Sequence, residues 1–145
     1  MKLAQIQMHV TADKAANLRH AEDLLRSVRG ADMAILPEMF CCPYDNACFH
    51  AYSEPEGGPA YQMLSHTARE LNLWLVGGSL PALDGAKIYN TAYVFAPTGP
   101  CVARHRNMHL FAIDLQGGQS FRESPPPYPG HAHTIQPPPP GSTGL

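Results

Sequence analysis

The first part of the chain alternates between short apolar runs and a longer segment with helical periodicity. Residues 2–8 alternate imperfectly between apolar and polar side chains, which is typical of a short strand. In residues 15–28, apolar side chains recur at steps of three and four until Gly30. Thr11 or Asp13 can accept a hydrogen bond from the first free N–H groups of this segment. The pattern predicts a strand followed by an amphipathic helix.

The next apolar runs predict two buried strands separated by a loop and a helix. Residues 33–36 are continuously apolar, as expected for a strand buried on both faces, and Pro37 ends its hydrogen-bonding ladder. Residues 41–58 show few repeats of any period and predict a long functional loop. Pro59 suits the first turn of a second amphipathic helix. The apolar run in residues 73–79 predicts a third strand.

The following pattern predicts a hairpin and completes an α/β fold. Residues 89–95 and 101–105 read as strands, and they flank a turn with Pro97 and Gly99. The order strand, helix, strand, helix, strand, hairpin is typical of an α/β layer fold. A content of 44% hydrophobic and 15% charged residues in 145 is enough for one domain with a hydrophobic core.

The composition changes after Ser124. Eight of the fifteen prolines lie in the last 21 residues, where few apolar side chains remain. Such a segment buries too little surface to offset the entropy of ordering it. We therefore expect a folded domain over residues 1–124 and a proline-rich, poorly ordered segment over residues 125–145.

Charge and terminal pattern exclude several classes of partner. Ten basic and twelve acidic residues give a formal charge of -2, so we expect no basic face and no nucleic acid as a partner. The first residues lack a continuous apolar stretch, so neither a signal peptide nor a membrane span is expected, and we expect a cytoplasmic protein. The four cysteines show no Cys-x-x-Cys spacing and are interpreted as reduced thiols.

Glu38 is the first candidate for chemistry. It follows an inner strand directly, at the end where open α/β sheets tend to place their sites. A carboxylate at a strand end is more often a solvated or helix-capping group than a catalyst. The buried strand and the turn at Pro37 would, however, partly desolvate this carboxylate and suit it to general-base work.

Residues 104–111 combine two arginines, two histidines and an asparagine, and they leave several interpretations open. An anion or nucleotide contact is one, and ordinary structural hydrogen bonds of the histidines are the commoner explanation. A metal site is a weaker alternative, because no matching Cys or carboxylate motif accompanies the histidines. It would use His105, His109, His131 and His133.

Two other groups have ordinary explanations when taken alone. Glu123 belongs to a short charged segment that reads as an exposed turn. Cys41, Cys42 and Cys48 are more readily explained by packing than as nucleophiles, because a buried thiol behaves as a small hydrophobe.

Taken together, eight segments in order resemble the nitrilase superfamily of carbon-nitrogen hydrolases, and the pattern is most similar to its omega-amidase-like group. The segments are the opening strand, Ala16-Asn17-Leu18, Leu36-Pro37-Glu38, Pro43-Tyr44 with Phe49 and Tyr52-Ser53-Glu54, Gly77-Gly78-Ser79, Tyr89-Asn90-Thr91-Ala92, His109-Leu110-Phe111 and Phe121-Arg122-Glu123-Ser124.

The resemblance implies a fold and a mechanism. The fold would be the N-terminal half of a four-layer αββα nitrilase-type sandwich. Glu38 would be the general base that takes a thiol proton, Glu123 an additional carboxylate, and Tyr44 a residue that lines the pocket. A lysine would stabilise the oxyanion, and a cysteine would form a thioester that water hydrolyses. The resemblance implies no cofactor and no metal, and it implies a homodimer or higher oligomer for the intact family.

Two departures from the family pattern affect the expected activity. Asn107 stands at the lysine position, two residues before His109-Leu110-Phe111, and loss of one such stabilising group typically costs on the order of a hundredfold to a thousandfold in rate. The sequence ends at Leu145, before the strand that would carry the cysteine. We therefore expect a fragment or degenerate amidase that is inactive alone. A non-catalytic binding or regulatory module is the alternative.

Overall fold

The computed structural model describes residues 1–45, 48–108, 112–114, 120–122 and 128–130, of which 112–114 and 120–122 are described by their backbone only. The helices are α1 (Lys14–Ser27), α2 (Phe49–Tyr52) and α3 (Pro59–Leu71). The strands are β1 (Leu3–Gln5), β2 (Met33–Ile35), β3 (Glu54–Pro55), β4 (Trp74–Val76), β5 (Leu80–Asp84), β6 (Lys87–Phe95), β7 (Cys101–Arg106), β8 (Ala112–Asp114) and β9 (Ser120–Arg122).

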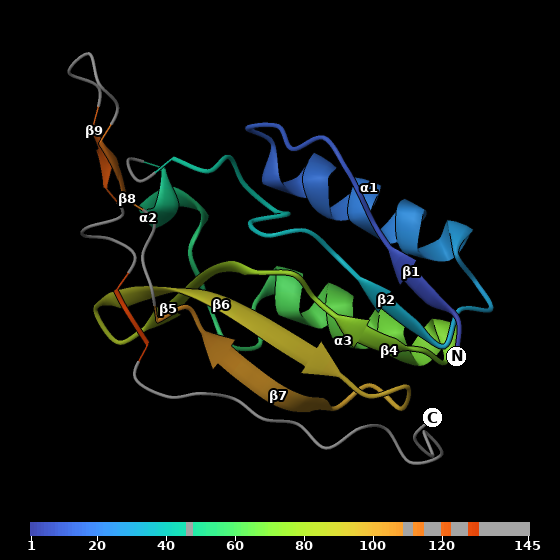
Figure 1. The fold of residues 1–145 in the computed structure, drawn as a ribbon. Coiled ribbons are helices and arrows are strands. Elements are labelled where there is room, and N and C mark those ends of the chain that lie inside the picture. Colours follow the sequence, from blue (N-terminus) through green and yellow to red (C-terminus); the bar gives the residue numbers. More distant parts are fainter. Residues whose placement is uncertain (46–47, 109–111, 115–119, 123–127, 131–145) are drawn as a thin grey trace.

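A seven-stranded mixed sheet organises the molecule (Figure 1). Its order is β1-β2-β4-β6-β5-β3, and β7 pairs with β6 as well. The β1, β2 and β4 strands are parallel, whereas β6 runs antiparallel to β4, β5 and β7. The β4 and β5 strands pair with different parts of one edge of β6, and β7 pairs with its other edge. The β6 strand is therefore bonded to three other strands.

Both predicted helices form, and their ends follow from local chemistry. The Asp13 side chain caps α1 by accepting a hydrogen bond from the Ala16 N–H at 2.9 Å. Pro59 occupies the first turn of α3, where its missing N–H costs nothing. Asn72 ends that helix in the left-handed conformation, with φ of 51°. The sequence therefore predicted both helices, with Pro59 in the first turn of α3 and Asp13 as one of two candidate caps of α1. The predicted end of the first helix at Gly30 was too late, since α1 ends at Ser27, and the cap at Asn72 was not predicted.

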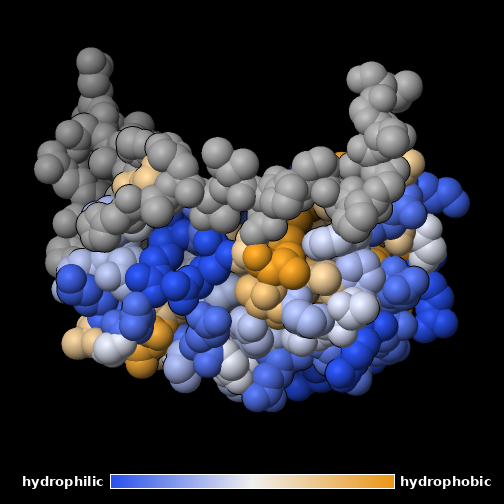
Figure 2. All heavy atoms as spheres, turned by 90° about the horizontal axis from the view of Figure 1, so that it is seen from below, coloured by the Kyte–Doolittle hydropathy of each residue, from blue (hydrophilic) through white to orange (hydrophobic). Residues whose placement is uncertain are grey.

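The hydrophobic core lies between the sheet and the two longer helices, which contact one another. Ala34 and Leu75 at the centres of β2 and β4 are fully buried on this side. Their neighbours Ile35, Trp74 and Val76 alternate to the other face of the sheet, where they are only half-buried. At β2 and β4, the sheet thus has one face that is fully buried and one apolar face that is less covered. Figure 2 shows hydrophobic residues gathered in a patch between hydrophilic ones on the underside of the molecule.

The structure differs from the sequence prediction in three places. The long functional loop predicted for residues 41–58 contains two short elements, α2 and β3. The predicted strand over residues 73–79 is shorter, since Gly78 adopts a positive φ of 56° that ends regular pairing. A further strand, β5, follows at once and pairs with β6 through a turn at Gly85. The predicted hairpin of β6 and β7 is confirmed.

Part of the proline-rich segment is described. The Tyr128 N–H donates to the Ile88 carbonyl oxygen at 2.7 Å, and the Gly130 N–H donates to the Asn107 carbonyl oxygen at 2.9 Å. These bonds hold residues 128–130 beside the start of β6 and the end of β7. The other residues of the predicted segment 125–145 lie outside the described residues, so the predicted domain division stays a prediction. Among the described residues, no helix has the length and apolar character needed to cross a bilayer.

Candidate active site

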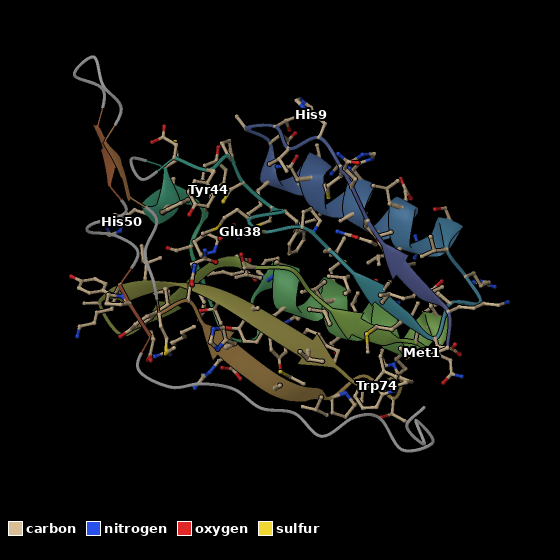
Figure 3. All side chains as sticks on the ribbon, in the orientation of Figure 1. Met1, His9, Glu38, Tyr44, His50 and Trp74 are labelled. Carbon is tan, nitrogen blue, oxygen red and sulfur yellow. The ribbon has the colours of Figure 1, made fainter. Side chains whose placement is uncertain are left out.

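The turn that carries Glu38 is shaped by close backbone contact. After β2, the Leu36 N–H still donates to the Val76 carbonyl oxygen at 3.0 Å. Gly78 lies so near this turn that a Cβ atom on it would be 2.0 Å from the Pro37 carbonyl oxygen. Met39, which follows Glu38 in the chain, has a φ of 48° and is buried. Figure 3 shows Glu38 beyond the carboxyl end of β2, where the sequence predicted a functional side chain.

Ser79 fixes the other side of the same turn. Its hydroxyl oxygen accepts a hydrogen bond from the Met39 N–H at 3.1 Å, and both residues are buried. Met39 and Phe40 enter the core, so Glu38 faces outward at the mouth of the turn. Glu38 is accordingly exposed, and the predicted partial desolvation of this carboxylate was wrong. The reason is that the turn after Pro37 directs the following side chains, and not Glu38, into the apolar interior.

Asn90 on β6 holds the Glu38 carboxylate. Its Nδ2 donates to Glu38 Oε1 at 2.7 Å, across a sequence separation of 52 residues. The Asn90 side chain is only 2% exposed, and its Oδ1 is buried without a hydrogen-bond partner. One carboxylate oxygen is therefore fixed, and one buried amide oxygen beside it remains unsatisfied.

A cavity of about 220 Å³ opens next to this pair. Asn107 reaches the cavity because its N–H donates to the Asn90 carbonyl oxygen at 2.8 Å, at the exit of β7. The structure thus brings Glu38 and Asn107 into the same cavity. The lining residues are Glu38, Gly78, Ser79, Asn90, Ala92, His105 and Asn107.

The cavity has one carboxylate and no arginine or lysine among its described lining residues. The two arginines beside His105 in the sequence form ion pairs with other residues. The guanidinium of Arg104 lies 2.7 Å from the Glu56 carboxylate, and that of Arg106 lies 2.6 Å from the Asp84 carboxylate. The Arg106 guanidinium also stacks on a tyrosine ring. The formal charge of the cavity is therefore negative when His105 is neutral.

The other predicted site residues are not placed in the cavity. Tyr44 is 38% exposed, and its ring packs edge-on against Phe49 with centroids 5.8 Å apart. It is not among the described lining residues, and its predicted role stays a prediction. Glu123 lies outside the described residues.

All four cysteines are described, and none lines the cavity. Cys41 and Cys42 are buried in the core. Their mutual hydrogen bond raises the pKa of the Cys41 thiol, assisted by burial, and lowers the pKa of Cys42. Cys48 and Cys101 are half-buried. Among the described residues, the cavity therefore contains one carboxylate and no thiol.

The metal alternative has no support from the described residues. Of its four histidines, His105 lines the cavity. The others, His109, His131 and His133, lie outside the described residues. Within the described ranges, no group of three or more His, Cys, Asp or Glu side chains is arranged to hold a metal ion.

Sequence reasoning gave no role to Asn90 or Ser79, although both belong to segments noted for their resemblance. The available signal was a buried strand interrupted by an amide: Asn90 lies between Tyr89 and Thr91 in a run that is otherwise mostly apolar. A polar side chain inside such a strand requires a hydrogen-bond partner. The pattern could not identify Glu38 as that partner, because the contact is long-range.

The chain is similar in sequence to known carbon-nitrogen hydrolases. A family model described as carbon-nitrogen hydrolase matches residues 2–144. Omega-amidase NIT2 of Danio rerio is 44% identical over 131 residues, which cover 89% of this chain and 47% of the relative. The human omega-amidase NIT2 is 40% identical, with 89% and 48% covered. The chain spans about half the length of these curated relatives.

A solved structure agrees with these matches. The crystal structure of Saccharomyces cerevisiae Nit3, a member of branch 10 of the nitrilase superfamily, superposes with a TM-score of 0.79 at 32% sequence identity. The match covers 92% of this chain and 50% of Nit3. The observed mixed sheet with its two packed helices therefore corresponds to part of a nitrilase-type fold.

Proposed function

The chain belongs to the carbon-nitrogen hydrolase family, and from that premise we propose that its cavity is the general-base part of an omega-amidase-like site for small carboxylic amides. The proposal depends above all on one observation: Glu38 and Asn107 line the same cavity. The identity to omega-amidases supports the substrate class.

In this proposal Glu38 takes a proton from the attacking nucleophile. Asn90 fixes Oε1 through its 2.7 Å hydrogen bond, and no described residue bonds to Oε2. The second oxygen is therefore available for the proton. Because Ser79 and Gly78 constrain the turn, the carboxylate is held in place before a substrate arrives.

Asn107 would be a weaker stabiliser of the reacting amide than a lysine. Its side-chain amide can donate a hydrogen bond to the developing oxyanion but carries no positive charge. No lysine or arginine compensates among the described lining residues of the cavity. The oxyanion would therefore gain less stabilisation than a charged donor provides.

We propose further that the 145-residue polypeptide alone does not hydrolyse amides. An amide is a poor electrophile, and its attack by a thiolate requires a cysteine beside the base. None of the four cysteines lines the cavity, and Cys41 and Cys42 are buried in the core. The part of human omega-amidase NIT2 that aligns with this chain is 48% of that protein's length.

The corresponding experiment is an assay of ammonia release from glutaramate and succinamate with the purified chain. We expect release no faster than in the protein-free blank, because no described residue of the cavity offers a thiol for acyl transfer. Human omega-amidase NIT2 serves as the positive control for the assay. Turnover that disappears in Glu38→Ala would contradict the proposed inactivity.

A non-catalytic binding module is the second candidate. Asn107 and the absence of a cavity thiol among the described residues favour it. Under this alternative, glutaramate binds with the same affinity in Cys41→Ser and the native chain, and it is recovered unchanged. Equilibrium dialysis followed by mass spectrometry of the ligand distinguishes binding from turnover.

A further inference from the structure

The β6 strand extends beyond the end of β7. The β7 strand pairs with residues 91–95 of β6, whereas β6 begins at Lys87. Near that start, the Ile88 carbonyl oxygen accepts a hydrogen bond from the Tyr128 N–H at 2.7 Å. In Figure 1, residues 128–130 are the short red stretch beside the start of β6. This segment therefore extends the sheet edge past the end of β7.

Asn107 is held on both sides of its backbone. Its N–H donates to the Asn90 carbonyl oxygen at 2.8 Å, and its carbonyl oxygen accepts the Gly130 N–H at 2.9 Å. The β7 strand already ends at Arg106, and a residue just beyond a strand end tends to fray. The bond from Gly130 thus restrains a residue that lines the cavity.

The backbone of Gly130 lies too close to Arg106 for any side chain. Gly130 is buried, and a Cβ atom on it would lie 2.5 Å from the Arg106 carbonyl oxygen and 2.6 Å from the Arg106 Cβ atom. Neither atom can rotate away. The Arg106 guanidinium is also restrained, since it lies 2.6 Å from Asp84 and 4.0 Å from the centre of the Tyr89 ring. A larger residue at position 130 would therefore have to move away from Asn107.

Tyr128 anchors the other end of the segment. Its ring packs against Tyr89 with centroids 6.1 Å apart, and Lys87 Nζ lies 5.3 Å from the centre of the Tyr128 ring. Between the two anchors, Pro129 is exposed and has a fixed φ. The segment is therefore attached at Tyr128 and at Gly130 and is stiff between them.

We propose that residues 128–130 form a clamp that positions Asn107 at the cavity, with Gly130 as the positioning residue. Asn90 connects this clamp to Glu38, because its carbonyl oxygen accepts the Asn107 N–H and its Nδ2 donates to the Glu38 carboxylate. A hydrogen-bond donor stabilises a developing charge best when it is held in place beforehand. The clamp deepens the proposed function and rests on it, since it treats this cavity as the site.

Gly130→Ala tests the clamp, and Gly30→Ala is its matched control. Gly30 lies between α1 and β2, and nothing lies within 4 Å of a Cβ atom added there. Hydrogen exchange of the Asn107 N–H should be roughly tenfold faster in Gly130→Ala, because loss of the hydrogen bond from residue 130 frees Asn107. In Gly30→Ala it should stay within roughly twofold of the native rate. Exchange of the Leu75 N–H in β4 reports any change in global stability.

The second readout is the response of Asn107 to the charge of Glu38, which a loss of stability alone does not change. Glu38→Gln should shift the side-chain amide resonance of Asn107 in the ¹⁵N-labelled chain. In the Gly130→Ala background this shift should fall to roughly half or less, because the amide lies farther from the charge. Asp23→Asn removes an equal charge from the exposed surface of α1 and should leave the resonance unchanged.

Tyr128→Ala and Tyr128→Phe form a second pair, which tests the clamp even where Gly130→Ala does not fold. The alanine variant loses the ring contacts with Tyr89 and Lys87, so exchange of the Asn107 N–H should be roughly threefold faster. The phenylalanine variant keeps the ring and should show the native rate.

Several results would overturn the inference. These are unchanged Asn107 exchange in folded Gly130→Ala, equal acceleration in Gly30→Ala, an undiminished response to Glu38→Gln, or equal rates in Tyr128→Ala and Tyr128→Phe. The amide-resonance dispersion of each variant establishes that it is folded. The measurements contain no amide substrate, so their failure leaves the amidase proposal standing. Conversely, the ammonia-release assay does not depend on Gly130, and its failure leaves the clamp intact.

Discussion

Replacing Glu54 by alanine is expected to lower the free energy of unfolding by about 3–5 kcal/mol. Glu54 is 4% exposed, and its Oε2 lies 2.6 Å from Lys14 Nζ. Its Oε1 accepts hydrogen bonds from the Ala60 and Tyr61 N–H groups at 2.9 and 3.1 Å. One carboxylate therefore joins the start of α1 to the start of α3.

The expected loss is large because several groups are left without partners. The alanine variant would leave Lys14 partly buried, with the Tyr52 carbonyl oxygen as its remaining acceptor. It would also leave the first N–H groups of α3 unsatisfied, and Gly58 at the N-cap of that helix makes no side-chain cap. Removing one member of a buried pair costs more than the pair itself contributes.

Urea denaturation of the purified chain measures this effect. Glu22→Ala is the matched control, because Glu22 also forms an ion pair, but with Arg26 on the same helix and at the exposed surface. We expect that control to change stability by less than about 1 kcal/mol. If the two variants lose equal stability, the Glu54 contacts do not join the helices in solution.

Replacing Gly78 by alanine is the second large effect, with an expected loss of about 2–4 kcal/mol in unfolding free energy. A Cβ atom here would lie 2.0 Å from the Pro37 carbonyl oxygen and 2.8 Å from that of Leu36, and φ is 56°. These are backbone atoms, so no side chain can rotate away. The turn must move, and Glu38 with it.

Gly85→Ala separates this clash from backbone strain. Gly85 has a similar φ of 60°, but nothing lies within 4 Å of the added Cβ atom. We expect a loss of only about 1 kcal/mol there, from the left-handed conformation alone. Thermal unfolding compares the two variants, and similar melting temperatures would refute close packing of Gly78 against the turn.

Local patterns were sufficient to predict the elements with strong periodicity. Helices α1 and α3 and strand β2 follow from apolar spacing and from the caps at Asp13 and Pro59. Strand β5 was missed because Pro81 argues against a strand and because the apolar run before it was assigned to a single strand. Helix α2 has only four residues, which is too short to show a period.

Sequence reasoning was less complete at the site. The position of Glu38 after a buried strand is a local property and was predicted. The assignment of Asn107 to the family's lysine position, made from the resemblance, stays a prediction. The Asn90–Glu38 and Lys14–Glu54 contacts join residues 52 and 40 positions apart. No local pattern specifies such partners, because they depend on strand pairing and helix packing. The exposure of Glu38 depends on the same tertiary arrangement.

The central claim is that Glu38, Asn90 and Asn107 meet in one cavity at the end of β2. The most direct measurement is the ¹⁵N–¹H spectrum of the side-chain amides in the native chain and in Glu38→Gln. The account predicts that removing this charge shifts the resonances of both Asn90 and Asn107, whereas Asp23→Asn shifts neither. Unchanged Asn90 and Asn107 resonances in a folded Glu38→Gln variant would contradict it.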